Sequence, residues 1–255
     1  DTGRSVEIVC IGCLRRVLPV EWAIMLLARM CCEVIEVDES GRCDEVRGFG
    51  QQKDGVGPHF AWANRKKKGV AVDLRQAEGQ EIARALAKTA DVVVENFSAG
   101  VMARFGLDYE SLKDRCPKLV YLSVSAYGQT GQMQDRPGFD PVLQAESGMM
   151  SLTGEADGEP MRHALSLVDT ITGLQSVAAV CAALLARGQS GKGQRIDLAL
   201  MDMAVASLGN AGLFYLCSGE QPKRAGNSHM TSTPTNLFYA EDGPNYMALG
   251  TNRLY

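Results

Sequence analysis

Short apolar runs alternate with helical patterns along the first two thirds of the chain. Each run is four to eight residues of mainly aliphatic character, and strands are predicted over residues 6–13, 33–38, 70–74, 91–94 and 119–124. Apolar positions recur at helical spacing in the stretches between, which predicts helices over residues 21–30, 78–88 and 109–114. This alternation is typical of a mostly parallel sheet with crossover helices. The pattern therefore predicts an α/β, Rossmann-like fold.

The pattern changes after residue 140. Helices are predicted over 141–150, 165–187 and 202–217, with a strand over 194–200 and a hairpin over 238–249. The helix over 165–187 is apolar nearly all round, so we expect it to be buried in the core or against another subunit. We predict a large domain over residues 1–217, followed by a linker and the start of a smaller second domain over 218–255. The chain stops inside a predicted β element, which suggests a truncated protein.

Composition narrows the class of protein. Hydrophobic residues make up 45% and charged residues 22% of the 255 positions, which is ordinary for a globular protein. The formal net charge of -4 gives no overall attraction for nucleic acid. The sequence has no uninterrupted apolar run of roughly 18 residues, and its first residues lack a signal-peptide pattern. We therefore expect a cytoplasmic protein that binds neither membrane nor nucleic acid.

Eight cysteines and three histidines raise the question of a metal or redox site. Cys10 and Cys13 have CxxC spacing, but they lie inside an apolar run, and a structural zinc site needs a second pair that the sequence lacks. The histidines are scattered. We expect buried or incidental free thiols in a reducing compartment and no metal, with a redox or metal role as the less favoured alternative.

Several common enzyme classes lack their motifs here. There is no phosphate-binding Walker loop, no GxGxxG after the first strand and no GxSxG elbow. Polar residues instead follow the predicted strands, where ligands of open α/β sheets collect. Arg75, Asn96, Phe97 and Arg104 are a set that a phosphorylated, purine-bearing ligand requires. From the residues alone, solvated arginines and a core phenylalanine are the favoured explanation.

Asp169 is the less ordinary residue, because it lies in the apolar lead-in to a long apolar helix. One interpretation is a helix cap, in which its carboxylate accepts backbone N–H groups. The other is a covalent nucleophile, which the helix dipole and backbone donors keep ionised. The residues alone favour the cap.

The segments DVVVENFSAGVMARFGLDYESL, LVYLSVSAYGQTG, DRPGFDPVLQAESGMMSLTGE, VDTITGL and GKGQRIDLALMD occur here in this order. Together they resemble the class III CoA-transferase family, which also contains α-methylacyl-CoA racemases. The resemblance covers nearly the whole chain. It implies an enzyme that forms interlocked homodimers at full length, uses coenzyme A and acyl-CoA as substrates, and needs no permanently bound cofactor.

The resemblance also assigns site residues. Asp169 matches the catalytic aspartate, which attacks an acyl-CoA thioester and then carries acyl and CoA groups in turn. Asp140 matches an acidic position near the reacting carbonyl. The positions that match the lining of the CoA site are Val72, Arg75, Asn96, Phe97 and Arg104.

Three functions remain open. A transferase is favoured over a racemase, because racemisation needs an acid/base pair and Phe139 stands where racemases have a histidine. The segment over 215–229 resembles the branch that handles succinyl-CoA and small dicarboxylic acids, and Arg224 or His229 could hold a distal carboxylate. A basic surface linker explains that segment equally well.

The third function is an inactive CoA-binding or structural homologue, and it is motivated by departures near the N-terminus. Pro19, Val20 and Glu21 replace a small residue and Gly-Pro, which in the family bring backbone close to the ligand. Glu39 replaces residues near a CoA phosphate, which its charge would repel.

Overall fold

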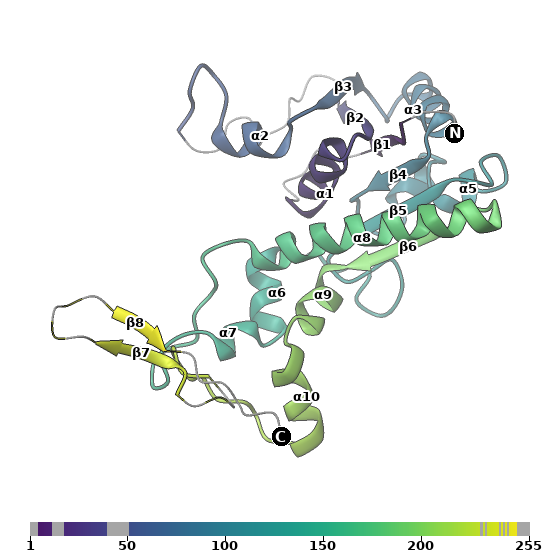
Figure 1. Ribbon diagram of the computed structural model, residues 1–255. Coiled ribbons are helices and arrows are strands. Elements are labelled where there is room, and N and C mark those ends of the chain that lie inside the picture. The colour runs from purple at the N-terminus through teal and green to yellow at the C-terminus, as the bar shows by residue number, and fades with distance from the viewer. Residues whose placement is uncertain are drawn as a thin grey trace. The chain divides into compact units, whose positions relative to one another are not determined.

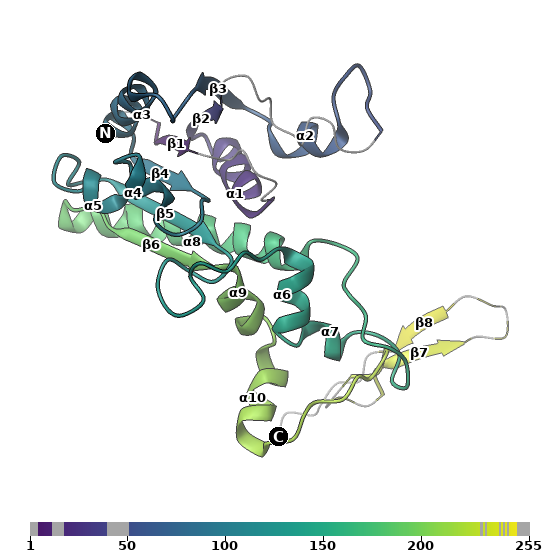
Figure 2. The same cartoon turned by 180° about the vertical axis from the view of Figure 1, so that it is seen from behind.

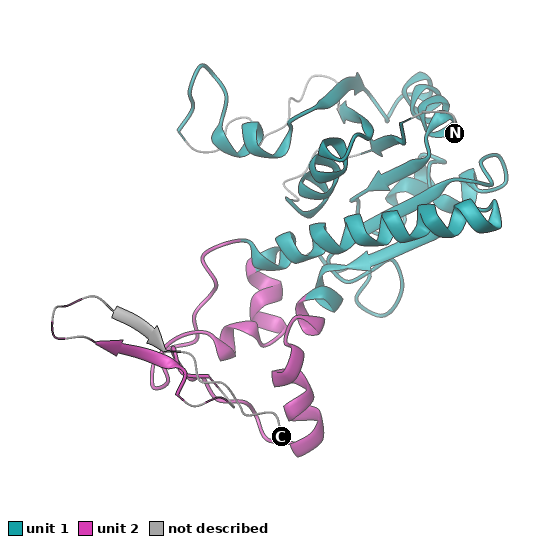
Figure 3. Cartoon of the chain, in the orientation of Figure 1, with its two compact units in different colours: residues 1–140, 166–203 teal, residues 141–165, 204–255 magenta. Residues whose placement is uncertain are grey.

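The computed structural model describes residues 5–11, 18–39, 51–229, 232, 234–239, 241, 243 and 245–248. The chain divides into two compact units, Asp1–Asp140 with Ser166–Met203, and Pro141–Leu165 with Ala204–Tyr255 (Figure 3). This division differs from the boundary predicted after residue 217. Residues 141–165 and 204–217 group with the C-terminal part of the chain.

The first unit is built on a six-stranded parallel sheet (Figure 1). Its strands are β1 (Glu7–Ile11), β2 (Glu33–Glu39), β3 (Lys67–Val72), β4 (Val92–Glu95), β5 (Val120–Ser125) and β6 (Arg195–Ala199). They lie in the order β3-β2-β1-β4-β5-β6, and every neighbouring pair is parallel. The α/β, mostly parallel fold is thus confirmed. The strand order reverses between β1 and β4, and such a switch point is where open α/β sheets bind ligands.

Helices cover both faces of this sheet (Figures 1 and 2). One face carries α1 (Leu18–Arg29) and α8 (Leu167–Ser190), and the other carries α3 (Ala77–Thr89), α4 (Val101–Arg104) and α5 (Tyr109–Leu112). A further short helix, α2 (Pro58–Ala63), follows β2 in the chain. Trp62 of α2 stacks on Trp22 of α1, with ring centroids 4.4 Å apart.

The core follows from strand alternation. Val9, Val93 and Tyr121 are each at most 1% exposed and belong to one cluster with residues of α3, α4 and α5. Because successive strand residues face opposite sides, Ile8 and Val92 point to the other face, where they are equally buried. Burying each such aliphatic side chain stabilises the fold by about 1.5–3 kcal/mol.

Close packing of α8 on α1 depends on a glycine. A Cβ at Gly173 would lie 2.7 Å from Trp22 Cδ1 and 2.8 Å from the Pro19 carbonyl oxygen, so no larger residue fits without movement. The prediction that this apolar helix is buried is confirmed for the side that holds Val168, Thr172 and Val180, each 0% exposed. The outer side is open, and Leu174 and Leu185 on it are 52% and 75% exposed.

In the described part of the chain, α8 is also long and apolar enough to cross a membrane, with a mean hydropathy of 1.6 over its best 18 residues. Two further helices follow one another in the chain, α9 (Leu200–Ala206) and α10 (Gly209–Ser218). They are long and apolar enough to cross a membrane only if both count as one broken span. A core helix of a soluble protein meets these criteria too, so they are weak evidence for a span.

Several predicted boundaries are wrong. Strand β3 begins at Lys67, three residues before the predicted start, and Lys67 already pairs with Val34 of β2. The prediction placed the basic run before the strand, although the Lys67 side chain is buried. The helix predicted over 141–150 is two helices, α6 (Asp140–Glu146) and α7 (Met149–Leu152), since Gly148 between them has a φ of 89°. The helix predicted over 202–217 is likewise split into α9 and α10. Helices α2 and α4 were not predicted.

The predicted C-terminal hairpin is confirmed. In the second unit, β7 (Asn236–Tyr239) pairs antiparallel with β8 (Asn245–Ala248). The pairing joins Asn236 to Ala248 and Tyr239 to Asn245, so the turn falls between them as predicted.

Candidate active site

Asp169 lies in the first turn of α8 and is 9% exposed. Among the described residues, no hydrogen bond reaches its carboxylate. The predicted capping role is therefore wrong. The N-cap position of α8 belongs to Ser166, and its side chain makes no capping hydrogen bond either.

Asp140 is the residue that caps α8. It is 3% exposed and begins α6, and its Oδ2 accepts the backbone N–H of Val168 at 2.7 Å and that of Asp169 at 3.2 Å. Helix starts leave such N–H groups without partners inside the helix, so a buried carboxylate from another element stabilises α8. The structure thus brings two predicted site residues, Asp140 and Asp169, to the same helix end.

The electrostatics of Asp169 also differ from expectation. Burial, and to a lesser extent the negative charge of Asp140, together raise the pKa of the Asp169 carboxyl to about 7. The dipole and backbone donors were expected to keep this group fully ionised, but Asp140 accepts those donors. A group with this pKa changes protonation close to neutral pH.

Asn96 and Phe97 follow β4, at the switch point of the sheet. The Asn96 side chain donates Nδ2–H to the Val124 carbonyl oxygen at 2.6 Å, which fixes the turn against β5. The Phe97 ring meets the Phe105 ring edge to face, with centroids 6.3 Å apart. Since Phe105 directly follows Arg104, this contact brings the turn and the exposed Arg104 to the same region.

Val72 and Arg75 lie at the end of β3, three strand spacings from β4 in the sheet order. At about 4.8 Å per spacing, roughly 15 Å separates the two strands. Val72 is 4% exposed and belongs to the apolar cluster on which Phe97 also packs. Exposed Arg75 pairs with Asp73, with 2.8 Å between Nε and Oδ1. The predicted CoA-site residues are thus spread along one sheet edge.

The N-terminal departures have structural explanations. Val20 is 0% exposed and is part of the core, and Pro19 fits the first turn of α1, where its missing N–H costs no hydrogen bond. Glu21 was expected to place a charge where the family has glycine. Its side chain is instead 5% exposed and forms an ion pair with Lys67 of β3, whose own side chain is 2% exposed.

Lys67 is held on several sides. Its Nζ also donates to Asn64 Oδ1 at 2.8 Å and lies 3.9 Å from Glu36 Oε1. This buried contact joins α1 to the sheet. Val20 and Glu21, two of the residues that motivated an inactive homologue, therefore serve the packing of α1. The side chain of Glu39 falls outside the described residues.

Glu95 is a buried acid that sequence reasoning missed. It ends β4, is 3% exposed, and accepts the backbone N–H of Phe97 at Oε2, 2.8 Å away. Burial raises the pKa of its carboxyl to about 7, against the opposing effects of Ser123, the Phe97 N–H and Arg195. The signal in the sequence was an acid that closes an otherwise apolar strand.

The cysteine predictions are partly wrong. Cys10 takes part in a disulfide bond, whereas free thiols were expected throughout. The other described cysteines are free, namely Cys31, Cys32, Cys116, Cys181 and Cys217. Among the described residues, no group of three or more His, Cys, Asp or Glu side chains could hold a metal ion.

In the second unit, Arg224 acts as a clamp on the chain itself. Its guanidinium donates to the carbonyl oxygens of Ser151 at 3.1 Å and of Glu155 at 3.2 Å, and also to that of Gly158. His229 accepts the Ser232 N–H at Nδ1, 3.0 Å away. The basic segment considered for a distal carboxylate therefore has a structural use.

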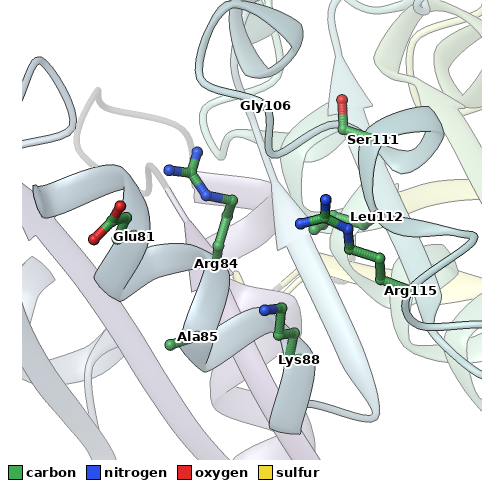
Figure 4. A pocket seen from close by; sticks show the side chains of 8 residues that line it. All are labelled: Glu81, Arg84, Ala85, Lys88, Gly106, Ser111, Leu112 and Arg115. Carbon is green, nitrogen blue, oxygen red and sulfur yellow. The ribbon is translucent and has the colours of Figure 1, made fainter. Parts of the chain in front are cut away.

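A pocket of about 720 Å³ lies between α3 and α5 on the flank of the first unit (Figure 4). Arg84, Lys88 and Arg115 point toward it, and none of the predicted site residues lines it. Arg84 donates Nη1–H to the Phe105 carbonyl oxygen at 3.0 Å. Lys88 and Arg115 are exposed, and a solvated basic surface accounts for them.

Comparison with known proteins gives one consistent family. A model of CoA-transferase family III matches residues 8–255. The chain is 42% identical over 246 residues to the succinate–glutarate CoA-transferase of Agrobacterium fabrum, covering 94% of this chain and 62% of that protein. It is 35% identical over 243 residues to the succinyl-CoA:glutarate CoA-transferase of Homo sapiens, covering 95% and 56%.

Solved structures agree with the fold. A CaiB/BaiF family protein from Brucella suis is 38% identical, with a TM-score of 0.85 over 93% of this chain and 63% of that chain. The present chain thus spans about three fifths of the length of the proteins it matches.

Proposed function

Because the chain belongs to CoA-transferase family III, we propose that the whole protein moves coenzyme A from an acyl-CoA to a carboxylic acid, with Asp169 as the residue that becomes acylated. One observation carries the role of Asp169. Its carboxylate is largely buried and accepts no hydrogen bond from the described residues, since Asp140 accepts the backbone donors of the helix start. A carboxylate that is desolvated in this way keeps its lone pairs for attack on a carbonyl carbon.

The proposed reaction balances without a cofactor. The Asp169 carboxylate attacks the thioester carbon, and the carbon–sulfur bond breaks. CoA departs as its thiolate, and the acyl group stays on Asp169 as a mixed anhydride. The thiolate then attacks the aspartyl carbonyl and releases the first acid as its carboxylate. The acceptor carboxylate attacks the resulting aspartyl-CoA thioester and expels thiolate. That thiolate takes the new acyl group, which frees Asp169.

The substrates that we propose are succinyl-CoA or a similar acyl-CoA and a small dicarboxylic acid. The relatives named above act on succinate or succinyl-CoA and on glutarate, which supports this class. One described position argues against a racemase. Phe139 precedes Asp140, and a hydrocarbon ring cannot exchange a proton with a substrate.

We also propose a homodimer in the cytoplasm, without permanently bound cofactor or metal. Exposed apolar side chains on α8, among them Leu174 and Leu185, support an assembly, because large apolar patches often mark protein contacts. Light scattering of the full-length protein at increasing concentration would test the dimer.

The test of the reaction is chemical trapping. Full-length protein incubated with succinyl-CoA and quenched with hydroxylamine should carry a hydroxamate at Asp169, found by peptide mass spectrometry. Asp169→Ala should lose the adduct and reduce exchange into labelled glutarate by at least about a thousandfold, since the covalent route is removed. Asp114→Ala, at an exposed acid, is the matched control. Full exchange by Asp169→Ala would refute the mechanism.

A further inference from the structure

Glu95 occupies a defined place in the sheet. It lies directly between Ile11 of β1 and Ser123 of β5, and Ser123 in turn lies beside Asp197 of β6. Because side chains alternate along a strand, Glu95 points to the same face as Val93, the face that α3, α4 and α5 cover. Its carboxyl is therefore enclosed by protein on the side that leads to Phe97.

The carboxyl fixes the backbone of the turn that follows. Oε2 accepts the Phe97 N–H at 2.8 Å, and the Ser123 side chain also forms a hydrogen bond with Glu95. The Phe97 carbonyl oxygen lies 3.5 Å from Gln129 Nε2, and the Gln129 N–H is bound by the Asp197 carboxylate at 3.0–3.1 Å. Phe97 is thus held at its N–H by Glu95 and lies within hydrogen-bond distance of Gln129 at its carbonyl oxygen.

Glu95 also lines a cavity of about 140 Å³. At roughly 30 Å³ per molecule, this volume can hold a few waters, which gives a proton access to the buried carboxyl. The titratable and charged groups that surround Glu95 come from three elements: Tyr121 from β5, Arg195 and Asp197 from β6, and Asp108, Tyr109 and Glu110 from the start of α5.

We propose that Glu95 is a positioning residue, which holds the Asn96–Phe97 turn in place for coenzyme A. Coenzyme A should therefore bind more tightly when the Glu95 carboxyl is ionised than when it is protonated. A charged carboxylate accepts a stronger hydrogen bond from the Phe97 N–H than a neutral carboxyl does, so ionisation holds the Asn96–Phe97 turn in place. This inference rests on the proposed function, since it assumes that the turn contacts coenzyme A.

The direction of the pH effect follows from the surroundings of Glu95. Burial is the largest influence and raises the pKa of the carboxyl to about 7. The acid is therefore mostly neutral at pH 6 and mostly ionised at pH 8. Coenzyme A affinity should rise across this interval as the turn becomes fixed.

The first measurement needs no catalysis or ligand. In ¹⁵N-labelled protein, the Phe97 amide shift should titrate with a midpoint near pH 7, and Glu95→Gln should abolish that titration. Ser123→Ala removes a hydrogen bond that lowers the pKa of Glu95, so the midpoint should move to higher pH. Glu78→Gln, at an exposed acid on α3, should leave the wild-type curve unchanged. A Phe97 amide that does not titrate would overturn the proposal, and Ser123→Ala tests it even if Glu95→Gln fails to fold.

The second measurement is calorimetric binding of coenzyme A at pH 6 and pH 8. Wild type should bind about three- to tenfold more tightly at pH 8 than Glu95→Gln does, and the two should converge at pH 6. Comparing variant with wild type cancels the titration of the coenzyme A phosphate itself. Equal affinities at pH 8 would sink the positioning role. If wild type bound no coenzyme A at either pH, the proposed function would be refuted as well. The Phe97 amide titration, which needs no ligand, separates this failure from a failure of the link between Glu95 and Phe97.

Discussion

At the scale of single residues, Asp140 has two effects, one on the start of α8 and one on the pKa of Asp169, and substitutions can separate them. Its carboxylate accepts two backbone N–H groups of α8, and its charge raises the pKa of Asp169. Asp140→Ala should lower the free energy of unfolding by about 1–2 kcal/mol, because it removes a buried cap. Asp140→Asn keeps an acceptor oxygen, so its loss should be smaller. Urea denaturation of both variants measures the difference.

Both substitutions should also shift the activity profile of the full-length protein. Without the neighbouring charge, the pKa of Asp169 falls, so the acidic limb of the rate profile should move to lower pH. Burial, the larger influence, remains, which keeps that pKa above its ordinary value. An acidic limb that stays in place in Asp140→Asn would show that Asp169 is not the titrating nucleophile.

From the residues alone, Asp169 had two possible roles, and Asp140 became a candidate only through the family resemblance. An acid just inside an apolar helix suggests either a cap or a nucleophile, and the tertiary contact of Asp140 with α8 removes only the cap. Asp140 precedes Asp169 by 29 positions, so no local pattern could show that it caps α8. Glu95 was missed for a similar reason, because burial and cross-strand neighbours, not spacing, set its properties.

At the scale of elements, replacing either of two glycines of α8 with alanine should change the free energy of unfolding, but in opposite directions. Gly173→Ala should lower the free energy of unfolding by about 1–2 kcal/mol, since its Cβ would meet the Pro19 carbonyl oxygen and Trp22. Gly188→Ala meets nothing within 4 Å and should raise it by up to about 1 kcal/mol through helix propensity. Thermal unfolding compares them, and equal effects of the same sign would mean that α8 does not pack closely on α1.

Element prediction succeeded where periodicity was strong and failed where single contacts decide. The strands of the sheet centre are continuous apolar runs, which the sequence shows directly. Strand β3 starts earlier than predicted, at Lys67, which looks like a surface residue in a basic run but is buried and paired with Glu21. Gly148 ends α6 by its left-handed backbone, a change that apolar periodicity does not register.

At the scale of the whole molecule, alternation of strands and helices was enough to predict a parallel α/β sheet. Strand order followed less directly, since the step from β3 back past β2 and β1 to β4 is set by long-range pairing. The division into units was also beyond sequence patterns. The chain leaves the first unit after Asp140 and returns to it at Ser166, so residues 141–165 belong to the second unit. Asp140 nevertheless caps α8, the helix that follows this return.

The stability of the first unit should depend on pH through two buried acids. Glu95 and Asp169 have pKa values of about 7 in the folded chain, well above those of the unfolded chain. A raised pKa adds stability that is fully present below the unfolded value and is lost as pH rises through the folded value. Between pH 6 and pH 8 each carboxyl should therefore lower the free energy of unfolding by about 1 kcal/mol. In urea titrations at the two pH values, the double variant Glu95→Gln/Asp169→Asn should lose most of this dependence, whereas Glu78→Gln should keep it. A wild-type protein that is more stable at pH 8 than at pH 6 would contradict the burial of these two charges.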